Sequence, residues 1–152
     1  MLRSATTTDR AAIRAILHTI ELFPPEMLEE MMTDYLHNPD TEQYWFVYEA
    51  QDSVLGFCYA APEQLTDRTY NLLAIGVSAD QQGKGIGSQL MRHAETELAA
   101  AAKRLLLVDT SGTADFAPVR KFYAGLGYVQ ESVIRDYWGE GDDKVVFWKR
   151  LG

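Results

Sequence analysis

The feature that most constrains this chain is a glycine-rich segment between a strand-like stretch and a helix-like stretch. It reads Gln82-Gly83-Lys84-Gly85-Ile86-Gly87-Ser88. Residues 70–77 before it are apolar and favour a strand, whereas residues 89–95 after it open a helix. A glycine turn that leads into a helix exposes backbone N–H groups at the positive end of the helix dipole. The segment therefore predicts a phosphate site made of backbone amides.

The spacing of the glycines excludes two common phosphate motifs. A P-loop requires Gly-x-x-x-x-Gly-Lys-Ser/Thr, but here Lys84 precedes the second glycine and no Ser or Thr follows it. The dinucleotide pattern Gly-x-Gly-x-x-Gly fails because Gly83, Gly85 and Gly87 alternate. By itself, such a turn is equally compatible with a flexible connection between a strand and a helix. The rest of the sequence must therefore distinguish this interpretation from a phosphate site.

Length and charge narrow the classes of partner. A chain of 152 residues predicts a single domain over residues 1–152. The net charge is −8, so we expect neither a nucleic-acid partner nor a membrane partner. No signal peptide and no membrane-length apolar run is apparent, which predicts a cytoplasmic protein. No cluster of Cys, His and Asp has the spacing of metal ligands, so no metal is expected. Cys58 lies in the apolar run 54–61, which predicts a buried side chain rather than a nucleophile.

The order of the expected helices and strands indicates an α/β fold. A short, very apolar strand at residues 104–109 is expected to run parallel to its neighbour, and residues 110–116 are expected to form a loop. Predicted helices cover residues 8–20, 25–37, 85–102 and 118–125, and predicted strands cover residues 44–50, 54–61, 70–77, 104–109, 128–138 and 144–151.

With this order of elements, the chain resembles the GNAT superfamily, the GCN5-related N-acetyltransferases, over essentially its whole length. Residues 82–87 match the family's Arg/Gln-x-x-Gly-x-Gly/Ala motif. Residues 120–128 are similar to its Phe/Leu-Tyr-x-x-x-Gly-Phe/Tyr element. The resemblance implies the acyl-CoA N-acyltransferase fold, a three-layer α/β/α architecture with a mixed, mostly antiparallel sheet of about six to seven strands.

The resemblance also implies acetyl-CoA as the acyl donor, without a metal. Ile75 and Val77 match the strand end that binds the pantetheine arm in the family, and Phe116 takes the place of an asparagine that often touches CoA. Gly76 is compatible with either a bulge that admits a ligand or simple packing. The other implied cofactor-binding residues form the pyrophosphate loop: Gln82, Gly83, Lys84, Gly85, Ile86, Gly87 and Ser88.

Three further positions concern the chemistry. Tyr123 matches a tyrosine that acts as general acid for the departing thiolate, although it is also compatible with a core position. Asn71 stands where many relatives carry Glu or Asp; it cannot take a proton but could position a water or the acceptor. Asp109 is the substitute candidate for the general base, because the carboxyl ends of parallel strands face the ligand crevice. Its alternative is a turn or helix-capping residue.

Together these residues predict direct attack of an amine on acetyl-CoA in a ternary complex, without a covalent intermediate. The expected acceptor is a primary amine of a small molecule or an amino-acid-like compound, held by the front helices, residues 44–46 and the last hairpin. One alternative is a protein N-terminal or lysine acetyltransferase. Another is a non-catalytic acyl-CoA-binding regulatory module, which the departures at Asn71 and Phe116 favour. The chain is expected to be a monomer or a homodimer.

Overall fold

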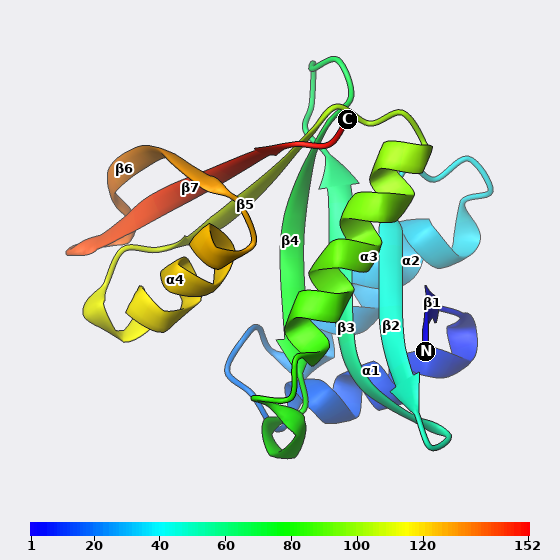
Figure 1. Ribbon diagram of the computed structural model, residues 1–152. Coiled ribbons are helices and arrows are strands. Elements are labelled where there is room, and N and C mark those ends of the chain that lie inside the picture. The colour runs from blue at the N-terminus through cyan, green and yellow to red at the C-terminus, as the bar shows by residue number, and fades with distance from the viewer.

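The computed structural model describes residues 1–152, in which seven strands form one mixed sheet (Figure 1). The strand order is β1-β2-β3-β4-β5-β7-β6, and only β4 and β5 run parallel. The predicted mixed, mostly antiparallel sheet is therefore confirmed. The strands are β1 (Leu2–Ser4), β2 (Tyr44–Ala50), β3 (Ser53–Pro62), β4 (Thr69–Val77), β5 (Leu105–Ser111), β6 (Val129–Gly139) and β7 (Asp142–Arg150).

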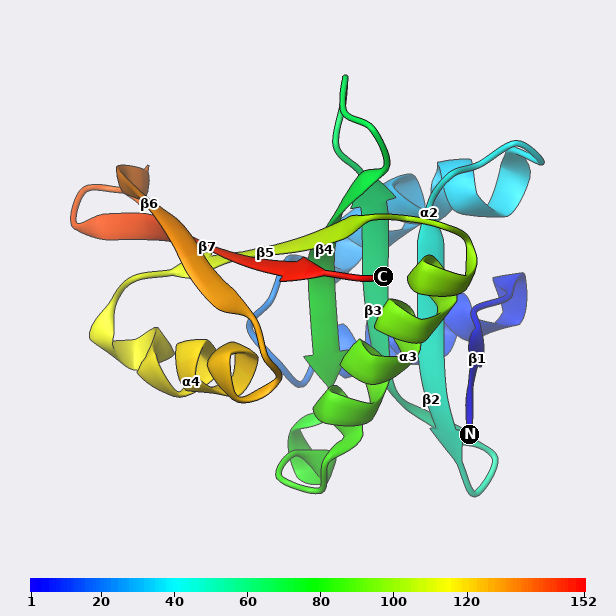
Figure 2. The same ribbon diagram turned by 45° about the horizontal axis from the view of Figure 1, so that its top comes forward.

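Four α-helices cover the two faces of this sheet, which confirms the three-layer architecture. Helices α3 and α4 lie on one face, and α1 and α2 lie on the other (Figure 2). None of these helices is long and apolar enough to cross a membrane. Their bounds are α1 (Arg10–Leu17), α2 (Leu28–His37), α3 (Ile86–Ala100) and α4 (Ala117–Gly125).

The predicted ranges need correction at three places. The helix predicted for residues 8–20 is shorter, because a 3₁₀ turn occupies Thr7–Asp9 and α1 ends at Leu17. Thr110 and Ser111 were predicted in a loop but continue β5, because they pair with β7. Strand β1 was not predicted at all.

The sheet separates two hydrophobic cores. One core lies under α3 and α4, and the other lies under α1 and α2. Strand β2 shows how one sequence serves both: Phe46 belongs to the first core, whereas Trp45 and Val47 belong to the second. Successive side chains of a strand point to opposite faces, so the alternation of residues 44–50 sends bulky groups into both cores. The Trp45 ring is fully buried and stacks on the Tyr59 ring at 4.3 Å between centroids.

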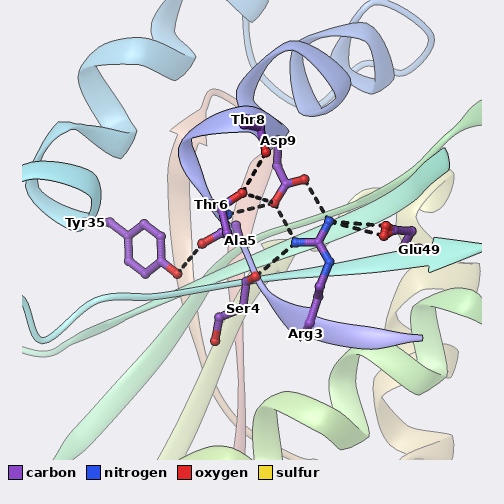
Figure 3. A network of polar contacts seen from close by, with 8 residues as sticks. All are labelled: Arg3, Ser4, Ala5, Thr6, Thr8, Asp9, Tyr35 and Glu49. Carbon is purple, nitrogen blue, oxygen red and sulfur yellow. Dashed lines mark hydrogen bonds and ion pairs between the residues drawn. The ribbon is translucent and has the colours of Figure 1, made fainter. Parts of the chain in front are cut away.

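Polar contacts hold the short strand β1 against β2 (Figure 3). The Arg3 guanidinium donates to both carboxylate oxygens of Asp9, at 2.7 and 2.9 Å, and lies 3.4 Å from the Glu49 carboxylate. The hydrogen bonds from Arg3 hold the pKa of Asp9 below its usual range. The Asp9 carboxylate also accepts from the backbone N–H of Thr6 at 2.7 Å, which caps the turn before α1. A three-residue strand that pairs with a distant strand and is fixed by contacts to Asp9 and Glu49 is too short to show a periodic pattern in the sequence.

Candidate active site

Strands β4 and β5 lie side by side at one end and diverge at the other (Figure 1). Their parallel pairing covers only Thr69–Leu72 and Leu105–Val108. Leu73 is an extra residue in β4 that pairs with no residue of β3, and its side chain is 52% exposed. Beyond this bulge, β4 pairs with β3 alone. The edge of β4 that faces β5 therefore keeps free backbone groups from Leu73 to Val77, where an extended ligand could bind.

Ile75 and Val77 lie on this free part of β4, as the sequence predicted, but Gly76 has a different role from a ligand-admitting bulge. A Cβ atom at Gly76 would lie 2.8 Å from side-chain atoms of both Ile20 and Phe57. Since the bulge is at Leu73, the packing alternative for Gly76 is the right one.

The glycine-rich loop follows β4 and has the backbone conformation that its sequence requires. Gly83 and Gly85 adopt φ values of +79° and +84°, the left-handed region that favours glycine, and no atom lies within 4 Å of a Cβ placed at either. Gln82 donates from Nε2 to the carbonyl of Val77 at 3.1 Å and so ties the loop to the end of β4. The exposed Lys84 donates to Gln81.

Helix α3 begins directly after Gly85 without a side-chain cap. The first N–H of α3 that bonds back to the loop is that of Gln89, which reaches the Gly85 carbonyl at 3.1 Å. The amides of Ile86, Gly87 and Ser88 are thus left without a backbone acceptor. Three free amides at the positive end of a 15-residue helix, beside an open loop, form a suitable cradle for a phosphate group.

The two motifs singled out in the sequence meet in the structure. A Cβ at Gly87 would lie 3.5 Å from the ring of Phe122 in α4. The Phe122 ring is 5.2 Å, centroid to centroid, from that of Tyr123. The glycine loop and the proposed acid are therefore neighbours across one layer of side chains.

Tyr123 is 5% exposed and lies in the core under α3 and α4. Its ring packs against those of Tyr128 and Phe147, and its hydroxyl makes no hydrogen bond. Burial, with a small contribution from the nearby Cys58 thiol, raises the pKa of Tyr123, so the phenol is protonated at neutral pH. Cys58 is fully buried, as predicted, and burial raises the pKa of its thiol to about 12. A thiol of this kind is not a nucleophile.

Asn71 and Asp109 are brought together on the face of the sheet opposite α3. Asn71 donates from Nδ2 to Glu63 Oε1 at 2.8 Å and to Asp109 Oδ2 at 3.1 Å. Lys144 Nζ lies 3.3 Å from the same Asp109 oxygen. The turn or capping alternative for Asp109 is wrong, because the residue lies within β5 and its carboxylate meets side chains of neighbouring strands.

Two members of this polar group, Glu63 and Lys144, were missed by the sequence reading. Glu63 follows β3 and also borders a hollow of about 370 Å³ under the loop that joins β3 to β4. One predicted residue stands apart from the group: Phe116 lies just before α4, is 41% exposed and belongs to neither core.

Comparison with known proteins agrees with this arrangement. The model of a family described as "Acetyltransferase (GNAT) domain" matches residues 40–130, more than half of the chain. A curated relative, "Uncharacterized N-acetyltransferase YsnE" of Bacillus subtilis (strain 168), is 29% identical over 136 residues, covering 89% of this chain and 87% of its own.

Solved structures show the same fold at low sequence identity. A GNAT-family protein from Desulfovibrio desulfuricans has a TM-score of 0.92 and 24% identity, covering 100% of this chain and 99% of its own. The ribosomal-protein-S18-alanine N-acetyltransferase from Escherichia coli has a TM-score of 0.81 and 20% identity, with 100% and 94% covered. An aminoglycoside 6′-N-acetyltransferase complexed with coenzyme A has a TM-score of 0.78 and 18% identity, with 100% and 97% covered.

Proposed function

Because the chain belongs to the GNAT family and is therefore an N-acetyltransferase, we propose that it moves an acetyl group from acetyl-CoA to a primary amine of a small molecule or an amino-acid-like compound. One arrangement carries the proposal: beyond Leu72, β4 has a free edge that leads directly into an open glycine loop and an uncapped helix. An extended ligand with a phosphate group at one end fits this order of features.

The residues present suit acetyl-CoA, which supplies an acetyl group activated as a thioester. The amides of residues 83–88 hold the pyrophosphate, with the turn shaped by Gln82. The free edge at Ile75 and Val77 receives the pantetheine arm. Phe116 has no contact in the structure that argues for a role with the cofactor, and its exposed ring leaves only apolar packing against the ligand.

The proposed general acid and the proposed general base lie on opposite faces of the sheet. Tyr123 belongs to the core under α3 and α4, whereas Asn71 and Asp109 lie on the opposite face. The gap between β4 and β5 is the place where groups from both faces can reach the same reacting atoms. Holding donor and acceptor there in a productive orientation contributes about 7–11 kcal/mol to lowering the barrier.

Proton transfers complete the reaction. Asp109 takes one proton from the ammonium form of the amine, and the neutral nitrogen then forms the new bond to carbon as the carbon–sulfur bond breaks. The nitrogen releases its second proton to water, while Tyr123 gives its proton to the sulfur. Burial keeps the Tyr123 phenol protonated, and the same apolar surroundings raise the proton affinity of a thiolate that forms beside it. Asn71 orients the carboxylate of Asp109 through its 3.1 Å hydrogen bond.

A protein N-terminus is the second candidate acceptor, and the last hairpin favours it. Every residue of β6 is exposed, and the neighbouring Tyr137 and Trp138 rings present large apolar surfaces. Exposed aromatic side chains on a strand at the edge of a sheet suit a peptide as well as a small amine.

The test is thiol release from acetyl-CoA with three acceptors: spermidine, kanamycin A and an alanine-initial hexapeptide. We expect turnover with at least one of the two small amines and weaker turnover with the peptide. Faster turnover with the peptide would replace the small-molecule proposal with the second candidate. Binding of CoA without thiol release from any acceptor would contradict both.

A further inference from the structure

The ammonium group of Lys144 lies in surroundings that would suit a substrate amine. Its Nζ is 3.3 Å from Asp109 Oδ2 and 4.3 Å from the centroid of the Tyr137 ring. A carboxylate and an aromatic face are the two groups that best attract an alkylammonium ion. The side chains of Lys144 and Asp109 are 17% and 18% exposed, so the pair lies near the surface but is largely covered.

Lys144 is nevertheless held loosely, and Lys149 in the same strand shows the difference. Lys149 Nζ donates to Glu95 Oε1 and to the carbonyl of Leu126, both at 2.8 Å. Lys144 makes no hydrogen bond, and its distance to Asp109 is long for a charge-assisted contact. Lys149 is fixed by two short hydrogen bonds, whereas Lys144 gives up only the Asp109 ion pair and the contact with the Tyr137 ring when it moves.

Beside this pair, Asn71 has a carbonyl oxygen without a donor. Asn71 is 5% exposed, and its Oδ1 is buried and has no hydrogen-bond partner. The orientation of the amide is determined by chemistry, because both partners of Nδ2 are carboxylate oxygens that can only accept. A buried acceptor without a partner is unfavourable, and an N–H donor would relieve it.

The charges around Asn71 also favour keeping a cation in this group. Glu63 and Asp109 contribute two negative charges and Lys144 one positive charge, so one net negative charge remains. Glu63 has no ion-pair partner of its own; its carboxylate accepts from the Asn71 amide. An acceptor ammonium that replaces Lys144 keeps one positive charge beside the two carboxylates, so the exchange does not cost the group its charge balance.

We propose that Lys144 occupies, in the free protein, the place that the ammonium group of the acceptor takes on binding. The acceptor ammonium displaces Lys144, pairs with Asp109 and lies against Tyr137. It sits nearer to Asn71 than Lys144 Nζ does, so that it donates an N–H to the carbonyl oxygen that Lys144 leaves without a partner. Because the place admits an unbranched lysine arm, the acceptor is a primary amine on a slim alkyl chain. This inference rests on the proposed function and deepens it.

The test compares Lys144→Met, which keeps the arm and removes the charge, with Lys144→Arg, which keeps a charge. The matched control is Lys103→Met, since Lys103 also lies over a tyrosine ring, that of Tyr70 at 5.2 Å, outside this group. For each protein we would measure kcat and KM with the best acceptor among spermidine, kanamycin A and the hexapeptide. Spermidine binding without acetyl-CoA would be measured by titration calorimetry.

We expect Lys144→Met to lower the KM for the acceptor and the Kd for spermidine about three- to tenfold, the size expected for removing one competing positive charge whose ion pair is long. Lys144→Arg and Lys103→Met should keep values near those of the wild type. If the wild type is active and Lys144→Met has an unchanged or raised KM for the acceptor, the inference about Lys144 is overturned and the proposed function still stands. If the wild type releases no thiol, the proposed function fails; equal spermidine binding by Lys144→Met and the wild type then overturns the inference separately.

Discussion

A Tyr123→Phe substitution removes one oxygen atom from α4 and should leave the fold unchanged. The ring would keep its neighbours Phe122, Tyr128 and Phe147, whose centroids lie 5.2, 6.0 and 5.7 Å away. The hydroxyl makes no hydrogen bond that could be lost. We therefore expect the free energy of unfolding in urea to change by less than about 0.5 kcal/mol.

The effect on the reaction should be much larger. A positioned general acid contributes about 10²–10⁴ to the rate. Loss of Tyr123 should lower kcat by this factor, which raises the barrier by about 2.7–5.4 kcal/mol. The measurement is kcat for thiol release at saturating amine, with CoA affinity determined by calorimetry. Affinity for CoA should stay within about twofold, since the phenol acts on the leaving sulfur and not on the phosphates.

Tyr128→Phe is the matched control. Tyr128 lies beside Tyr123, but its hydroxyl is expected to contribute to stability and not to the reaction. Its hydroxyl donates to Glu95 Oε2 at 2.7 Å, so the substitution should cost about 1.5–3 kcal/mol of stability while kcat stays within about twofold. If Tyr123→Phe kept kcat within threefold of the wild type, the acid role would be refuted. Equal losses of kcat in both variants would attribute the effect to packing instead.

Substitutions at three other positions test other parts of the structure. Gly85→Asp should weaken CoA binding at least about tenfold in calorimetry, because a carboxylate would enter the open loop beside the phosphates, whereas Gly85→Ala should show only the strain of a left-handed alanine, about 1–2 kcal/mol. Gly76→Ala should lower the free energy of unfolding by about 1–3 kcal/mol, since its methyl would lie 2.8 Å from Phe57, and an unchanged urea midpoint would contradict the packing role. Asp9→Asn should lose about 1–3 kcal/mol at pH 7. Because Arg3 lowers the folded-state pKa of Asp9, that loss should persist above about pH 4 and fade as the pH falls further; a pH-independent difference in unfolding free energy would contradict it.

Much of the fold could be predicted because the residue types and hydrophobic spacing of most segments indicate a strand or a helix without reference to the rest of the chain. Residues 44–50 are rich in aromatic and β-branched side chains, which favour a strand, and they form β2. The conformation of the glycine loop also follows from its own residues, because glycine adopts the left-handed φ angles found at Gly83 and Gly85 without steric cost. Its position before α3 needed no knowledge of distant contacts.

The polar group around Asn71 could not be predicted, because it depends on the order of the strands. In the sheet β7 lies between β5 and β6, so Lys144 is placed opposite Ser111 and beside Asp109. The order of the chain alone would put β6 next to β5. Glu63 likewise reaches Asn71 only through the register of β3 with β4. Gly76 was ambiguous for the same reason, since the atoms that exclude a side chain there come from Ile20 and Phe57.

The short parallel pairing of β4 with β5 has a consequence for motion. The core under α1 and α2 draws all its members from residues before β5, whereas the other core joins both parts of the sheet. Backbone hydrogen bonds join those parts where Thr69–Leu72 pairs with Leu105–Val108 and where the Arg104 N–H donates to the Arg68 carbonyl at 3.0 Å. Any rotation of β5, β6 and β7 relative to the other strands must move side chains of the core under α3 and α4, because that core joins both parts of the sheet. The width of the gap between β4 and β5 therefore depends on side-chain packing in that core as well as on the short backbone pairing.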